Sequence, residues 1–318
     1  METPAKDSAE HELITASLDL ERLEKNLFRS RSLWLPSRAR GVFGGQVISQ
    51  ALLSATNCVD AAYSLHSLHC YFLYSADASV PIVYHVETLR QGRSYTACNV
   101  KAVQNGQCIF AMTCSFQRPE LHQPTHQWPM PTDVPHPDDC PLQEDVYEQM
   151  ARLENVSAEA RERMLLYAHD RRHSPIAVKH ARLPDKKESF DEHGTTMYWL
   201  KARGVGHLEP SFHKCIVAYL SDLAFIGLAA RTLKLSYVGK PPKRLSMMSS
   251  LDHAMWFYDH NVNSADWLLH VMECPAAGSG RGFVQGRLYT QQGQLVAVTT
   301  QEGVVRAELD EPTSKAKL

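Results

Sequence analysis

The carboxylate of Asp222 is the group in this sequence that most directly indicates chemistry. It is the only charged residue between Lys214 and Arg231, in a segment that is apolar almost all the way round a helix. A helix of this composition is buried, and a buried carboxylate is costly unless it is hydrogen-bonded or its pKa rises. A raised pKa suits a general base near neutral pH. The alternative is a structural carboxylate paired with Arg203, Arg231 or a backbone cap, and the residues alone favour neither.

Ser250 and Gln301 are polar residues whose roles depend on two expected strands, 247–258 and 295–306. Alternation in the first strand places Met248, Ser250 and Asp252 on one face and Leu251, His253 and Met255 on the other. In the second strand, Ala297, Thr299 and Gln301 share a face. Short polar side chains among small residues suit a sheet that lines a site. They also suit a solvated face, which periodicity alone favours.

A proline-rich segment divides the elements that must position these residues into two groups. Seven prolines between Pro119 and Pro141 exclude a regular helix or a central strand and predict an extended strap. The following stretch, 142–167, has the pattern of a charged amphipathic helix on the surface.

The segments on either side of this strap follow one plan. Each begins with an uncharged or nearly uncharged helix, at 46–59 and 215–230. Each continues with four strands separated by turn signals such as Asn105-Gly106 and Gly278-Ser279-Gly280. The expected strands are 64–74, 80–90, 94–103 and 108–117, then 247–258, 267–274, 282–290 and 295–306. Such a unit buries its helix when the sheet curls round it, so we predict an α+β architecture with two wrapped central helices.

Composition and charge narrow the class of protein. Of the 318 residues, 44% are hydrophobic and 21% charged, the balance of a globular chain. A net charge of −2 provides no basic field for nucleic acid, and no apolar stretch is long enough to predict a membrane span or a signal peptide. The terminal Ala316-Lys317-Leu318 is similar to the S-K-L peroxisomal signal. We therefore expect a soluble, intracellular protein of the peroxisomal matrix, bound by the peroxisomal import receptor through this tripeptide.

Several long motifs, in order along the chain, resemble the type II acyl-CoA thioesterases, the double hot-dog family of bacterial thioesterase II. The resemblance covers about residues 14–306, with the strap and its helix weakly matched, and together with the C-terminal tripeptide it is closest to the eukaryotic peroxisomal members. The motifs are Phe43-Gly44-Gly45-Gln46, His66-Ser67-Leu68-His69-Cys70-Tyr71-Phe72, Tyr219-Leu220-Ser221-Asp222, Ser249-Ser250-Leu251-Asp252-His253-Ala254-Met255-Trp256-Phe257, Ser279-Gly280-Arg281-Gly282 and Gln301-Glu302-Gly303-Val304-Val305-Arg306.

The resemblance implies a fold, a reaction and a set of site residues. It implies two hot-dog units, each an antiparallel sheet wrapped round a long helix. The corresponding segments are residues 1–118 (N-terminal hot-dog), 119–190 (proline-rich linker and surface helix), 191–310 (C-terminal hot-dog) and 311–318 (tail with the peroxisomal-type signal). The family's catalytic residues fall on Asp222, Ser250 and Gln301, which would activate a water to hydrolyse fatty acyl-CoA without an acyl-enzyme and without a cofactor or metal. The family also associates through its sheets, which makes a homo-oligomer an expectation.

Other functions fit the residues less well. No G-x-S-x-G nucleophile elbow occurs, which argues against a serine hydrolase of the α/β-hydrolase type. The Asp-x-x-x-x-His pair that family knowledge assigns to hot-dog hydratases is missing too. Sixteen histidines suggest a metal site only weakly, because zinc needs three or four converging ligands. Arg281, in a Gly-rich turn, is a candidate contact for a CoA phosphate, although a hairpin turn explains the glycines as well. A catalytically inactive acyl-CoA-binding or scaffold protein on the same fold stays open.

Overall fold

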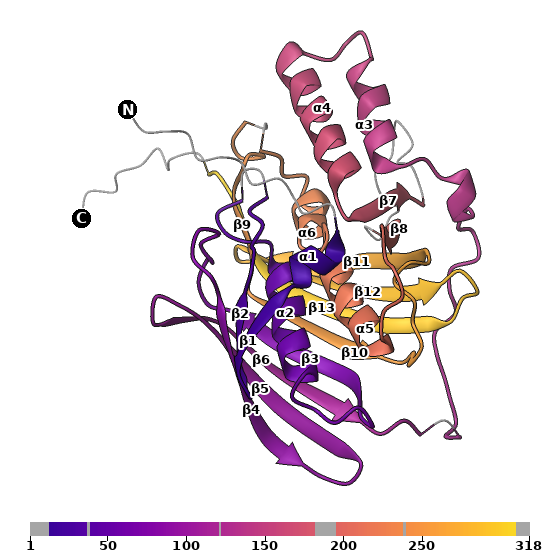
Figure 1. Ribbon diagram of the computed structural model, residues 1–318. Helices are drawn as coiled ribbons and strands as arrows, with labels where there is room; N and C mark the ends of the chain where they lie inside the picture. Colours follow the sequence, from indigo (N-terminus) through magenta and orange to yellow (C-terminus); the bar gives the residue numbers. More distant parts are fainter. Residues whose placement is uncertain (1–12, 37–38, 121, 182–194, 238–239, 310–318) are drawn as a thin grey trace.

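The computed structural model describes residues 13–36, 39–120, 122–181, 195–237 and 240–309 (Figure 1). The expected targeting tripeptide, Ala316-Lys317-Leu318, lies outside the described residues. Within them, every helix is too short or too polar to traverse a lipid bilayer.

The N-terminal half packs one long helix against an antiparallel meander. Helix α2 begins after Phe43 and ends at Thr56, and most of its residues are buried. The turn between β5 and β6 uses positive φ at Asn105 (49°) and Gly106 (77°), the backbone conformation that a tight hairpin requires. The expected helix and strands of this half are confirmed. Its elements are α1 (Ile14–Leu18), β1 (Leu20–Glu24), β2 (Leu27–Ser30), α2 (Gly44–Thr56), β3 (Ser64–Phe72), β4 (Val83–Gln91), β5 (Tyr95–Gln104) and β6 (Gln107–Gln117).

The C-terminal half repeats this plan with a shorter, interrupted helix. A small edge strand, β7, lies within the range 119–190 and pairs with β8, so the C-terminal sheet also takes in residues from the linker range. The elements are β7 (Ile176–His180), β8 (Thr196–Ala202), α5 (Pro210–Ser221), α6 (Gly227–Thr232), β9 (Leu245–Ser250), β10 (Asp252–Phe257), β11 (Leu268–Gly278), β12 (Arg281–Thr290) and β13 (Leu295–Ala307).

The two halves join edge to edge. In the part of the chain that the structure describes, the strands form one 13-stranded sheet in the order β1-β2-β4-β5-β6-β3-β10-β13-β12-β11-β8-β7, with β9 paired to β13. Strands β3 and β10 make the junction, with His69 opposite Ala254. Helices α2 and α5 pack against each other inside the curve (Figure 1), where the Ser49 hydroxyl donates to the Cys215 carbonyl at 2.8 Å. This arrangement confirms the predicted α+β double hot-dog.

The proline-rich strap crosses the C-terminal half. Its Gln127 amide donates to the Gly293 carbonyl at 2.7 Å and accepts from the Leu295 N–H at 2.9 Å. The Trp199 indole donates to the Pro135 carbonyl at 3.0 Å. The strap is therefore extended and is held by contacts with the outer side of the sheet. Among its described residues, the only helical segment is a short 3₁₀ turn, Pro137–Asp139.

The single surface helix predicted for 142–167 is wrong, because the segment forms two helices. Helix α3 (Gln143–Ala151) ends before a short connection, and α4 (Ala158–His173) begins after Ser157, whose hydroxyl accepts the Ala160 N–H at 3.2 Å. A serine in this position caps a new helix start. The hairpin of α3 and α4 stands over one end of the C-terminal sheet (Figure 1).

Candidate active site

The backbone at Asp222 differs from the sequence prediction. The expected continuous helix over 215–230 is wrong: α5 ends at Ser221, Asp222 is its C-cap residue, and α6 begins only at Gly227. Ala224, between them, has a left-handed φ of 59°, which a continuing helix does not allow. The carboxylate therefore projects from the end of a buried helix, where it can reach the other half of the molecule.

The carboxylate of Asp222 meets the start of α2. The backbone N–H of Gly45 donates to it, and the positive end of the helix dipole favours a negative charge there. A Cβ atom at Gly44 would lie 2.8 Å from Oδ2 of Asp222, and one at Gly45 would lie 2.8 Å from the carbonyl oxygen of Tyr219. Two successive glycines thus permit a contact between the helices that any side chain would block.

Gln301 reaches the same carboxylate from the sheet. Its side-chain Nε2 donates to Oδ1 of Asp222 at 2.7 Å and lies 3.2 Å from Nδ1 of His253. Ala297, Thr299 and Gln301 are all fully buried, which confirms that they share the inward face of β13. The amide oxygen Oε1 of Gln301 is buried and makes no hydrogen bond within the described residues.

Ser250 lies on the same inward face, at the end of β9. It is opposite Gly303 in β13, and directly opposite residues of an antiparallel pair point to one side of the sheet. Gly303 and Gln301 are two positions apart in one strand, so the side chains of Ser250 and Gln301 share a face. The structure therefore brings Asp222 and Gln301 into direct contact, with Ser250 diagonally across from Gln301.

The predicted strand over 247–258 is interrupted, which corrects the assignment of faces within it. The register is Ser250 opposite Gly303 in β9 but Ala254 opposite Thr300 in β10, a shift of one residue at Leu251 and Asp252. The Asp252 side chain accepts the Glu302 N–H at 2.8 Å and so takes over a bond of the ladder. As a result His253, which alternation placed on the opposite face, lies on the same side as Ser250.

Burial sets the protonation states of the site. Burial raises the pKa of Asp222, and the Gln301 amide and the Gly45 N–H oppose that rise. Its side chain is enclosed by protein on most sides, although the residue keeps partial exposure. Burial lowers the pKa of His253 to about 3, so its imidazole is neutral at physiological pH. The site therefore pairs a carboxylate of raised pKa with neutral hydrogen-bonding partners.

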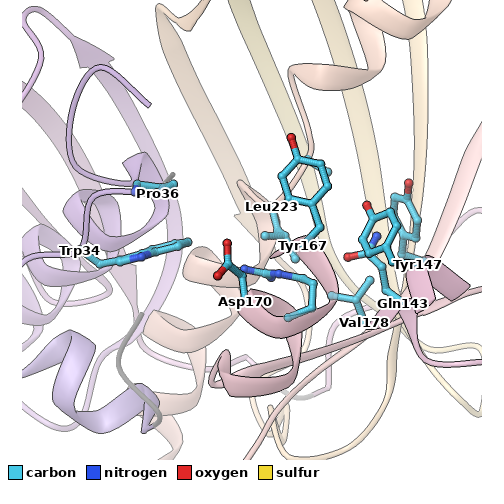
Figure 2. Close-up of a pocket in the computed structure, with 11 residues that line it drawn as sticks. Trp34, Pro36, Gln143, Tyr147, Tyr167, Asp170, Val178 and Leu223 are labelled. Carbon is cyan, nitrogen blue, oxygen red and sulfur yellow. The ribbon is translucent and has the colours of Figure 1, made fainter. Parts of the chain in front are cut away.

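A pocket of about 230 Å³ reaches the chain next to Asp222, although Asp222, Ser250 and Gln301 themselves do not line it. Leu223 and Ala224, which line it, directly follow Asp222 in the chain. Trp34 and Pro36 lie on one side, across from Tyr147 and Val178 (Figure 2). The lining residues are Trp34, Pro36, Gln143, Tyr147, Tyr167, Asp170, Arg171, Val178, Tyr198, Leu223 and Ala224. Most of these side chains offer apolar or aromatic surface, with tyrosine hydroxyl groups on three of them.

Arg281 lies away from the other candidates. It is opposite Val304 in β13, on the outer face rather than the face of Gln301, and its Nε donates to the Glu302 carboxylate at 2.9 Å. His253 and the pocket tyrosines, by contrast, were not among the candidates. The histidine belongs to the motif that contains Asp252-His253, but strand alternation placed its side chain on the wrong face, because the register shift is not visible in the sequence.

Two family models match the chain. The acyl-CoA thioesterase N-terminal domain matches residues 31–117, and the acyl-CoA thioesterase C-terminal domain matches residues 137–305. Acyl-coenzyme A thioesterase 8 of Rattus norvegicus is 39% identical over 298 residues, covering 93% of this chain and 89% of that relative. Peroxisomal acyl-coenzyme A thioester hydrolase 1 of Saccharomyces cerevisiae is 26% identical, covering 85% and 87%. The solved structure of acyl-CoA thioesterase II TesB2 from Mycobacterium marinum has a TM-score of 0.71 at 33% identity, covering 93% of this chain and 98% of that chain.

Proposed function

Since the chain belongs to the acyl-CoA thioesterase family and hydrolyses acyl-CoA to CoA and a free acid, we propose that Asp222, Gln301 and Ser250 carry out this hydrolysis. The observation that carries the proposal is the hydrogen bond of 2.7 Å between Gln301 Nε2 and Asp222 Oδ1. It joins two sequence-distant polar residues beside a helix start, within a buried polar cluster that includes Ser221 and His253. Such a group is a candidate general base by its environment.

The reaction proceeds by attack of water on the thioester carbonyl. Asp222 accepts a proton from the water as its oxygen bonds to the carbonyl carbon, while Ser250 and the free Oε1 of Gln301 orient the water. The tetrahedral oxyanion needs hydrogen-bond donors, and since the Gly45 N–H already donates to Asp222, the neighbouring Gly44 N–H at the start of α2 is the backbone donor that we assign to it. Collapse of this intermediate breaks the carbon–sulfur bond, and the proton held by Asp222 passes to the departing thiolate. No acyl-enzyme forms.

The pocket lined by Leu223 and Ala224 suits the acyl group of the substrate. Its walls are mainly apolar and aromatic, as in most sites for hydrophobic ligands, and two of its residues, Leu223 and Ala224, directly follow the proposed base. The size and side chains of this pocket would then set the preference for chain length. Contact of Arg281 with a CoA phosphate stays a prediction. Its guanidinium is exposed on the outer face of the sheet and paired with Glu302, so it would contact only a part of CoA that extends out of the site.

The expected location is the peroxisome, where the enzyme would act in fatty acid metabolism. The terminal Ala316-Lys317-Leu318 supports binding by the peroxisomal import receptor, and the yeast relative is named as peroxisomal. A reporter fused to this tail should become punctate like an S-K-L control, and diffuse fluorescence would contradict the assignment. Association of copies through their sheets is a further expectation, to be measured by analytical ultracentrifugation.

Replacement of the base tests the catalytic assignment. Asp222→Asn keeps the shape of the side chain but cannot accept the proton, so turnover should fall by at least ~100-fold while acyl-CoA still binds. Thiol release across a panel of CoA esters measures turnover, and calorimetry with a slowly cleaved ester measures binding. Near-wild-type kcat in this variant would refute the role of Asp222. The inactive-scaffold alternative requires binding without thiol release in the wild-type protein.

A further inference from the structure

A buried chain of hydrogen bonds behind Gln301 has a defined direction. The Ser221 hydroxyl lies 2.9 Å from the Ala218 carbonyl, to which it donates, and 3.0 Å from Nε2 of His253. We assign the single hydroxyl proton to this carbonyl, in preference to Sδ of Met255 at 3.2 Å, so that Ser221 accepts from His253 and Nε2 carries the ring proton. Nδ1 of His253 is then an acceptor, and the group 3.2 Å away is the amide nitrogen of Gln301. The chain thus fixes which end of the Gln301 amide faces His253.

The orientation of this amide decides what Asp222 meets. Nε2 of Gln301 carries two protons, and one donates to Asp222 while the other points to His253. In the opposite tautomer, His253 would donate from Nδ1, and the amide would turn its oxygen towards both neighbours. A carboxylate facing an amide oxygen is stabilised only when it is protonated, because the protonated form donates a hydrogen bond. The first arrangement favours an ionised Asp222 and the second a neutral one.

We propose that Ser221 and His253 are positioning residues that hold Gln301 with its amide nitrogen on Asp222, and thereby keep the general base ionised and the amide oxygen free for water. Both residues are fully buried and act through Gln301. The inference rests on the proposed role of Asp222.

The other titratable groups near this chain of hydrogen bonds are the same in the wild type and in the variants below. The tautomer of His253 is therefore the property that the test changes. Cys70 on β3 is buried, and its Sγ donates to the His253 carbonyl at 3.2 Å. Burial raises the pKa of its thiol and lowers the pKa of His270 on β11 to about 3. Asp252 on β10 has a raised pKa and accepts from the Glu302 N–H of β13. Of these groups, Cys70 and His270 stay neutral near pH 7, and Asp252 and Glu302 are unchanged in the variants below.

The test removes the acceptor for the His253 proton. Ser221→Ala leaves Nε2–H buried without a partner, which favours the other tautomer and the turned amide. The apparent pKa of the acidic limb of kcat/KM should rise by about one pH unit, a roughly tenfold loss below that limb. Ser221→Cys, with a weaker acceptor, should give a smaller rise. Ser54→Ala is the matched control, since Ser54 is a fully buried helical serine whose hydroxyl donates to the Gln50 carbonyl at 2.8 Å. The apparent pKa of the acidic limb of kcat/KM should be unchanged in this variant.

Nitrogen-15 NMR of the His253 ring provides a readout independent of turnover. The wild type should show a protonated Nε2 and an unprotonated Nδ1, with increased Nδ1 protonation in Ser221→Ala. A wild-type ring protonated at Nδ1, or an acidic limb that is unmoved in both folded Ser221 variants, would overturn the inference. Failure of the proposed function is separate: it appears as near-wild-type kcat in Asp222→Asn, whatever the His253 tautomer.

Discussion

Gly44 offers a sharp test of the site, because its substitution should separate activity from stability. It is the first residue of α2, and a Cβ atom there would lie 2.8 Å from Asp222 Oδ2 and 3.0 Å from Cζ of Phe72. In Gly44→Ala the added methyl group would push the Asp222 carboxylate away. Its bonds with Gly45 and Gln301 would then lengthen or break.

The two expected effects differ in size. Alanine is favoured over glycine in a helix by about 1 kcal/mol, while overpacking costs about 1–3 kcal/mol. The free energy of unfolding should therefore change by no more than ~2 kcal/mol. Displacement of a catalytic group by about 1 Å costs ~100-fold in rate, so kcat should fall by about that factor. KM should change little, since the pocket is untouched.

Gly227→Ala is the matched control, because Gly227 is the first residue of α6 and a Cβ atom there would contact nothing within 4 Å. Urea unfolding and thiol release should be measured on both variants. We expect Gly227→Ala to keep wild-type kcat, and Gly44→Ala to lose it while remaining folded. A folded Gly44→Ala protein with wild-type kcat would refute the proposed contact between α2 and the base.

Three further predictions concern the base, the pocket and the packing beneath the site. Burial raises the pKa of Asp222, so kcat/KM should increase with pH through an apparent pKa above that of an ordinary aspartate; a limb at or below the ordinary value would contradict this. Tyr147→Ala enlarges the pocket and should raise the relative kcat/KM for longer or bulkier acyl chains by about tenfold, whereas an unchanged chain-length profile would place the acyl group elsewhere. Gly303→Ala would bring a Cβ atom to 2.5 Å from Cγ1 of Ile226 and should destabilise the fold by about 1–3 kcal/mol in urea unfolding; wild-type stability would show that Ile226 moves without cost.

Much of the fold was predictable because its signals are local. An uncharged helix at 44–56, alternating strands and turns such as Asn105-Gly106 depend on neighbours in the chain. The lone charge of Asp222 in an apolar segment was likewise visible, since burial of a carboxylate needs a reason wherever it occurs. The repeated order of elements also predicted the double architecture, because each helix needs a sheet to cover it.

The site itself depends on contacts that no local pattern contains. The end of α5 at Ser221 and the shift of register at Leu251 come from packing between elements. That shift moved His253 to the face of Gln301, since one extra residue in a strand reverses the side to which all later side chains point. The sequence alone thus indicated Asp222 as a candidate base. Only the tertiary structure decided that Gly45, Gln301 and the Ser221–His253 pair surround it, because hydrogen bonds between distant segments form only once two helices and a sheet are packed together.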